Sequence, residues 1–206
     1  MYTVGFIDND PELFDDYQVR LKRKGINLIC SNECRSKDDF LIWVLENNIK
    51  CLMVDYLLKP DFPFQGTDLV VYFNEMLPDL PCIILTNYEE DSINEKLVVA
   101  YLICDRSIMD RDDIEDFTRK IKHAVEVFEN KMGRNLSEYS QLLERKRASG
   151  LNSSEEERFL HLYKILKSYG EVDDLPNNLL KDEMSDKMNT LLGKLDELIE
   201  KTENRG

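Results

Sequence analysis

Two short apolar segments of this sequence end in acidic residues that could bind a cation or a phosphoryl group. Asp8, Asn9 and Asp10 follow the first apolar segment, and Asp55 follows the third. In a doubly wound parallel sheet with strand order 2-1-3-4-5, these two segment ends are neighbours at the switch point where ligands bind. Two carboxylates side by side repel each other unless a cation or a hydrogen-bond donor lies between them. The spacing therefore predicts an acidic pocket formed by these residues.

Short apolar segments alternate with longer amphipathic ones over residues 1–132, which is typical of a parallel sheet covered by helices. Most of the apolar segments are continuous runs, as burial on both faces of a sheet requires. We expect five strands, at residues 2–8, 26–31, 50–55, 81–86 and 100–104. We expect helices at 11–25, from Ser36, from Gly66 or Thr67, at 91–97 and from Asp112. The predicted class is α/β, with a five-stranded parallel sheet in the order 2-1-3-4-5.

Beyond Met132 only helical periodicity remains, and the glycines at 133, 150 and 170 are the predicted breaks between helices. We therefore predict a first domain over 1–132 and an all-helical C-terminal extension over 133–206. Two short helices are expected at 135–148 and 154–169, followed by a longer one after Pro176. The longer segment carries an apolar stripe over 179–199 that is too apolar to be left in water. Leu191, Leu195 and Leu198 of this stripe are the predicted interface with a protein partner or a second copy.

Composition limits the location of the protein and the partners that it can bind. The 206 residues include 27 basic and 41 acidic side chains, and the resulting net charge of −14 disfavours nucleic acid and anionic membranes as partners. No apolar run approaches the roughly 20 residues of a membrane span, and no basic-then-apolar leader opens the sequence, so we expect a cytoplasmic protein. Its five cysteines include no Cys-x-x-Cys pair, which indicates neither disulfides nor a zinc site.

The acidic pocket and the strand spacing of residues 1 to about 130 resemble the receiver domain of bacterial response regulators, a flavodoxin-like fold. Under this resemblance, Asp55 matches the aspartate that accepts a phosphoryl group. The segment 81–86 looks like the fourth receiver strand, so Thr86 matches the switch hydroxyl at its end, and Tyr101 matches the switch aromatic residue.

Two residue types depart from the receiver pattern. Active receivers follow the first strand with two adjacent acids, the second of which binds Mg²⁺ directly, whereas this sequence has Asp8-Asn9. An amide in place of a carboxylate weakens the binding of this hard cation. The family also places a lysine near the end of the fifth strand, and here that position falls on Cys104 or Arg106. These departures predict a degenerate receiver with no metal and no other cofactor.

A third departure lies in the loop after Asp55, where Pro60 and Gly66 come later than receivers place them. Together the departures favour a non-catalytic regulatory or adaptor protein. Degenerate receivers with helical extensions resemble the inactive-receiver proteins of bacterial conflict and antiphage operons, a resemblance that implies a neighbouring effector as the partner.

Three other functions stay open. The chain could be a true phospho-acceptor regulator that binds Mg²⁺ and is modified on Asp55. Alternatively, Asp8-x-Asp10 together with Leu85-Thr86-Asn87 resembles the first two motifs of haloacid-dehalogenase-type phosphatases, which implies Asp8 as nucleophile and Asp10 as general acid. His161, with a lysine three residues later, is similar to the histidine of phosphotransfer domains.

Overall fold

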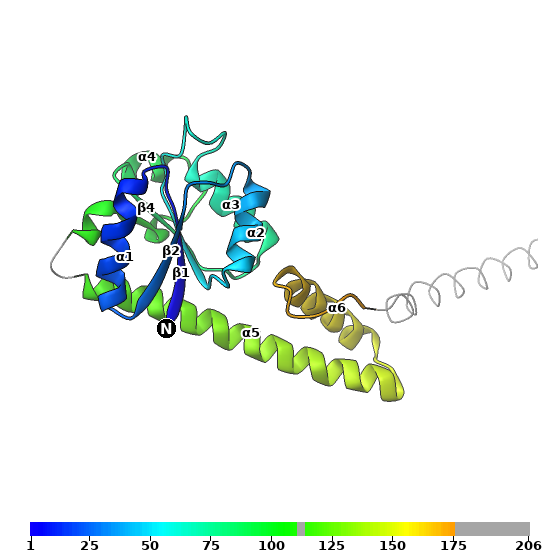
Figure 1. Ribbon diagram of the computed structural model, residues 1–206. Coiled ribbons are helices and arrows are strands. Elements are labelled where there is room, and N and C mark those ends of the chain that lie inside the picture. The colour runs from blue at the N-terminus through cyan, green and yellow to red at the C-terminus, as the bar shows by residue number, and fades with distance from the viewer. Residues whose placement is uncertain (111–113, 176–206) are drawn as a thin grey trace, which may run out of the picture. The chain divides into compact units, whose positions relative to one another are not determined.

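The computed structural model of the protein describes residues 1–110 and 114–175. Its centre is a five-stranded parallel sheet in the order β2-β1-β3-β4-β5 (Figure 1). The strands are β1 (Tyr2–Ile7), β2 (Ile26–Ser31), β3 (Cys51–Val54), β4 (Cys82–Thr86) and β5 (Ile103–Asp105). This order confirms the predicted flavodoxin-like α/β fold.

Helices cover both faces of the sheet. They are α1 (Phe14–Arg23), α2 (Lys37–Glu46), α3 (Gly66–Met76), α4 (Glu89–Asn94), α5 (Glu115–Ser149) and α6 (Ser153–Ser168), with 3-10 turns η1 (Pro11–Leu13), η2 (Ala100–Leu102) and η3 (Arg106–Met109). In Figure 1, α1 lies on one side of the strands, and α2 and α3 lie on the other.

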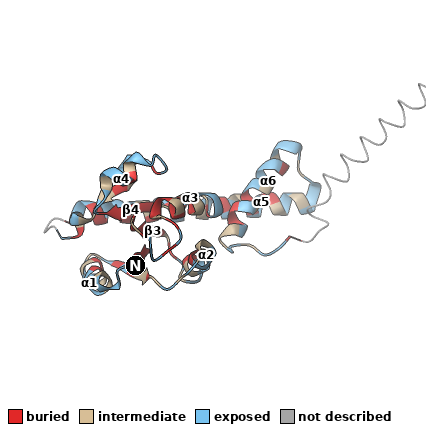
Figure 2. Cartoon of the chain, turned by 90° about the horizontal axis from the view of Figure 1, so that it is seen from above, coloured by how far each residue is buried: buried red, intermediate tan, exposed pale blue. Residues whose placement is uncertain are grey.

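Two hydrophobic cores follow from this layering, one on each face of the sheet. The first joins α2 and α3 to the sheet through residues such as Phe40, Phe73 and Leu52. The second joins α1 and α5 to the other face through residues such as Leu21 and Ile121. Buried positions accordingly lie along the strands and on the inner sides of the helices (Figure 2). Successive side chains of a strand point to opposite faces, so both faces must be apolar, as the continuous apolar runs indicated.

The structure corrects several predicted limits, among them those of the following three elements. The fifth strand does not begin at residue 100, because residues 100–102 form η2 and β5 runs from Ile103 to Asp105. The short fourth helix runs from Glu89 to Asn94 rather than over 91–97. The first helical segment opens with η1, whose N-cap is Asp10, and continues as α1.

The predicted helix break at Gly133 is wrong, because α5 runs through this glycine without interruption. A glycine inside a helix costs only about 1 kcal/mol relative to alanine, and packing on both sides of it offsets that cost. Phe128 and Tyr139, which flank Gly133 in α5, are both buried. The domain boundary that we place at residue 132 therefore falls inside one helix.

Helix α6 packs back along α5, and the hairpin is attached to the sheet domain. Tyr139 of α5 stacks on Phe159 of α6 with ring centroids 5.1 Å apart, and Lys146 forms a buried ion pair with Glu156. After α6, the Tyr169 hydroxyl donates a hydrogen bond of 2.7 Å to the carbonyl oxygen of Pro78. Met1–Glu171 is accordingly one compact unit.

The segment with the apolar stripe lies outside the described residues, so the structure does not address the predicted interface at Leu191, Leu195 and Leu198. Within residues 1–110 and 114–175, no helix is long and apolar enough to cross a membrane.

Candidate functional site

Asp8 and Asp55 lie at the carboxyl edge of the sheet, each one residue past the end of its strand. Ile7 of β1 is paired with Val54 of β3, and the Asp55 amide donates a hydrogen bond of 2.8 Å to the Ile7 carbonyl. Because the two parallel strands end at the same level, the first side chains past their ends, those of Asp8 and Asp55, lie next to each other. Both residues are buried, Asp8 completely and Asp55 with 5% of its surface exposed.

The guanidinium group of Arg106 lies between these two carboxylates. Its Nη2 atom is 2.6 Å from Oδ2 of Asp8 and 2.6 Å from Oδ1 of Asp55. Arg106 begins η3 directly after β5, and only 13% of its side chain is exposed. One cation therefore bridges two carboxylates that would otherwise repel each other in a buried setting.

The second oxygen of each carboxylate accepts a backbone hydrogen bond. Oδ1 of Asp8 accepts from the Asp10 amide at 2.8 Å, and Oδ2 of Asp55 accepts from the Leu57 amide at 3.1 Å. Each aspartate thus binds the amide two residues further on, the local turn that short acidic side chains favour. All four carboxylate oxygens have a donor.

The pKa of Asp8 is raised to about 6. Burial is the main cause and the nearby Asp55 carboxylate adds to it, against the lowering effects of Arg106 and the Asp10 amide. Desolvation disfavours the charged form more than the single guanidinium favours it, because that cation is shared between two acids. The site therefore holds a carboxyl group whose proton affinity is far above that of an exposed aspartate.

The side chains of the other two residues of the predicted acidic pocket bind other partners than this pair. The Asn9 amide donates a hydrogen bond of 2.7 Å to Oδ2 of Asp61, in the long loop after β3. Asp10 caps η1, with its Oδ1 accepting from the Glu12 amide at 3.0 Å. Asn9 and Asp10 thus position the loops around the site, and the carboxylate pair itself consists of Asp8 and Asp55.

Of the two candidates for the lysine position, Arg106 contacts the carboxylates and Cys104 does not lie among their partners. The strand β5 ends at Asp105, later than we expected, so the first side chain past its end is Arg106. Cys104 packs against the core on the α1 and α5 side, and burial raises the pKa of its thiol.

The two switch-like residues differ in their surroundings. Thr86, at the end of β4, is fully buried, and its Oγ1 accepts a hydrogen bond of 3.2 Å from the Tyr88 amide. Tyr101 lies in η2 and is 81% exposed. The Thr86 hydroxyl is therefore fixed at the edge of the sheet, whereas the Tyr101 ring lies in solvent.

The loop from Asp55 to Gly66 is held by its own side chains. Phe62 and Phe64 are buried, and both pack against Phe40 of α2, with ring centroids 5.6 and 6.3 Å from its ring. A Cβ atom on Gly66 would lie 1.9 Å from the carbonyl oxygen of Asp55, so only glycine fits there. This close approach fixes the backbone of Asp55 against the start of α3. The sequence indicated an altered loop at Gly66 but not this contact.

The residues present do not fit the Mg²⁺ ion that active receivers bind. The place between the two carboxylates is taken by Nη2 of Arg106, and the Asn9 side chain is bonded to Asp61. Among the described residues, no group of three or more His, Cys, Asp or Glu side chains could hold a metal ion.

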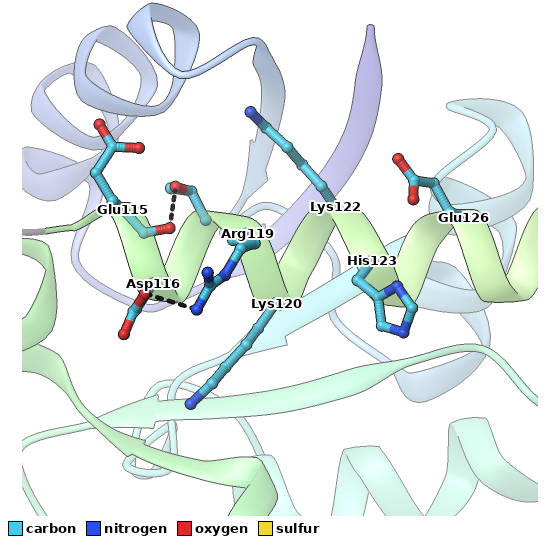
Figure 3. Close-up of a pocket in the computed structure, with 8 residues that line it drawn as sticks. Glu115, Asp116, Arg119, Lys120, Lys122, His123 and Glu126 are labelled. Atoms are coloured by element: carbon cyan, nitrogen blue, oxygen red, sulfur yellow. Dashed lines mark hydrogen bonds and ion pairs between the residues drawn. The ribbon is translucent and has the colours of Figure 1, made fainter.

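A separate hollow of about 720 Å³ lies along α5 between Glu115 and Glu126 and shares no residue with the carboxylate site (Figure 3). Its lining carries both signs of charge, much of it already paired. Arg119 contacts Asp116 at 2.8 Å, Lys24 pairs with Glu115, and the Tyr2 hydroxyl donates to Glu126. The lining holds three acidic and three basic side chains and so offers a ligand no excess of either charge, and we assign the hollow no function.

Comparisons with solved structures show the fold of response-regulator receiver domains over roughly the first 130 residues. The signal receiver domain of an HD domain-containing protein from Pseudomonas fluorescens Pf-5 is 14% identical, with a TM-score of 0.50, and the match covers 65% of this chain and 93% of that one. A CheY-like response regulator receiver domain protein from Methanospirillum hungatei JF-1 is 16% identical with a TM-score of 0.47, covering 64% of this chain and 98% of that one. No protein-family model and no curated protein matches the sequence.

The class that these observations define is therefore a receiver-like α/β domain, here extended by the α5–α6 hairpin. At this identity the likeness shows the fold alone, and the residues of the site must carry any statement about function.

Proposed function

We propose that this protein is a non-catalytic regulatory or adaptor protein, in which the receiver-like domain is held in one state by Arg106 and the chain acts by binding a protein partner. The observation that carries the proposal is the position of Nη2 of Arg106, 2.6 Å from both Asp8 and Asp55.

The chemistry of phosphoryl acceptance explains why this position matters. Transfer to Asp55 needs a free carboxylate oxygen and a cation that neutralises the charge of the incoming group, about −1.5 to −2. Both oxygens of Asp55 are bonded, to Arg106 and to the Leu57 amide. The same guanidinium also neutralises Asp8, so moving it to a phosphoryl group leaves a buried carboxylate without its counter-ion.

The partner is the second part of the proposal. The apolar stripe over 179–199, with Leu191, Leu195 and Leu198, is the surface through which we propose that the chain associates with a partner subunit or a second copy. The likeness to inactive receivers of antiphage operons supports an effector encoded nearby as that partner. Replacing Leu191 and Leu195 by glutamate should abolish association in light scattering and pull-down experiments while the circular dichroism of the receiver-like domain stays unchanged.

The experiment that tests the first part is intact-mass measurement after treatment with acetyl phosphate and Mg²⁺. We expect no mass addition to the full chain. The variant Arg106→Lys has the residue type that the family places here, and its mass is compared with that of the natural chain after the same treatment. The variant Asp55→Asn is the control that shows whether any modification is on Asp55.

A phospho-acceptor regulator is the second candidate, and the proximity of Arg106 to Asp55 favours it because a guanidinium can also neutralise a phosphoryl group. A mass addition to the natural chain that disappears in Asp55→Asn would establish this candidate and overturn the first. For the phosphatase alternative, we expect no turnover of a generic phosphomonoester, because Asp8 is buried and bonded at both oxygens.

A further inference from the structure

Glu95, the residue that caps the C-terminal end of α4, joins this helix to the segments next to Asp55. The Tyr56 hydroxyl donates a hydrogen bond of 2.9 Å to Oε1 of Glu95, and the Thr67 hydroxyl donates to Oε2. Tyr56 is 9% exposed and Thr67 is fully buried. Hydrogen bonds from buried donors to a carboxylate are among the stronger polar contacts in proteins.

Both donors are fixed to the backbone of Asp55. Tyr56 follows Asp55 directly, and Thr67 follows Gly66, whose backbone amide donates a hydrogen bond of 2.9 Å to the Tyr56 carbonyl. Gly66 also approaches the Asp55 carbonyl too closely for any side chain. A displacement of Asp55 must therefore displace the two hydroxyl groups that hold Glu95.

The residue after Glu95 supplies an independent sign of this attachment. Lys96 has a φ of +57°, and of the described residues with positive φ it is the one that is neither Gly, Asn nor Asp. A bulky side chain in this region is strained and persists where the surroundings determine the backbone on both sides. Here Glu95 is bonded on one side, and Val98 is buried in the core on the other.

We propose that Tyr56, Thr67 and Glu95 form a latch that couples the position of α4 to the position of Asp55. The latch gives α4 a link to Asp55 that uses neither the Thr86 hydroxyl, which is bonded to the Tyr88 amide, nor the solvent-exposed Tyr101. The inference rests on the proposed function, in which Arg106 holds the Asp55 site, and it adds the path that links this site to a surface element.

Hydrogen exchange of the α4 amides in the full chain tests the latch. The Ser92 amide within α4 donates to the Tyr88 carbonyl, and the Lys96 amide just past its end donates to the Ile93 carbonyl, so both report on this helix. In Tyr56→Phe/Thr67→Val, which removes both hydroxyls and keeps the side-chain shapes, we expect these amides to exchange about tenfold faster or more. Glu90→Ala, a loss of charge at an exposed position of the same helix, is the matched control and should leave the exchange unchanged. Equal exchange in the double variant and the control would overturn the proposal.

A double-mutant cycle tests the coupling to Asp55. Asp55→Asn should change α4 exchange by at least about fivefold in the natural chain, and should have no such effect in the Tyr56→Phe/Thr67→Val background. An effect of the same size in both backgrounds would refute the latch as the path. This readout is separate from the phosphodonor experiment, because a mass addition overturns the proposed function and leaves the exchange result standing, whereas unchanged exchange overturns the latch alone.

Discussion

Replacing Arg106 by methionine should destabilise the protein by about 3–5 kcal/mol near neutral pH. The variant keeps an unbranched apolar stem and removes the cation between Asp8 and Asp55. Removing one partner of a buried ion pair costs this much because the remaining charges stay buried without compensation. An exposed pair would cost only about 0–1 kcal/mol, so the size of the loss reports directly on the burial of the site.

Urea unfolding followed by circular dichroism measures this loss. With a slope of about 2 kcal/mol per molar urea, the midpoint should fall by roughly 1.5–2.5 M. Arg106→Lys keeps a cation but loses the planar group and should fall between the natural protein and Arg106→Met. Adding Asp8→Asn and Asp55→Asn to Arg106→Met removes the uncompensated charges and should recover most of the stability.

The loss should also depend on pH. The pKa of Asp8 is already raised to about 6, and loss of the guanidinium raises it further, so the carboxyl becomes neutral on mild acidification. The penalty of Arg106→Met should therefore shrink as the pH falls from 7 towards 5. A loss below about 1 kcal/mol at pH 7, or one that grows on acidification, would refute the buried bridge.

Three further predictions follow from the same contacts. Because the pKa of Asp8 is raised from 3.8 to about 6, the native state binds this proton more tightly than the unfolded chain does. The stability of the natural protein relative to Asp8→Asn should therefore rise by roughly 2.5 kcal/mol as the pH falls from 7 to 4, and urea midpoints that move the opposite way contradict this prediction. Gly66→Ala should lower the free energy of unfolding by at least about 1–3 kcal/mol, because the new Cβ atom meets the Asp55 carbonyl. Gly133→Ala, in open space within α5, should raise the free energy of unfolding by up to about 1 kcal/mol in the same urea experiments. Exchanging Mg²⁺ for a chelator should leave the thermal midpoint unchanged, and a rise with Mg²⁺ would show a metal site that Arg106 does not block.

Much of the fold could be predicted because its signals are local in the sequence. The alternation of apolar runs and amphipathic segments indicates parallel strands with helical connections, and strand ends at the same sheet edge bring Asp8 and Asp55 together. The cap at Ser36 is equally local, since its hydroxyl accepts from the Asp39 amide and the Asp39 carboxylate accepts from the Ser36 amide.

The remaining features depend on contacts between residues far apart in the chain. The continuity of α5 through Gly133 is decided by packing against α6 and the sheet, and a glycine read by itself indicates a break. The choice of Arg106 over Cys104 depends on where β5 ends, because the first side chain past the strand end is the one that reaches the carboxylates. The bonds of Glu95 to Tyr56 and Thr67 join segments more than 25 residues apart and have no sequence signature.

An arginine at this site changes the kind of control that the site allows. A diffusible metal ion stabilises the state that binds it in proportion to its concentration, and it can be released. A guanidinium attached to the chain has no such dependence, because its effective concentration is set by the fold. With Arg106 in this position, the same cation bridges the Asp8 and Asp55 carboxylates in every copy of the folded protein. Under the proposed function, any change of state must then begin elsewhere, at a surface that a partner contacts. It would reach Asp55 in the reverse direction through α4 and Glu95, because coupling between two sites is reciprocal.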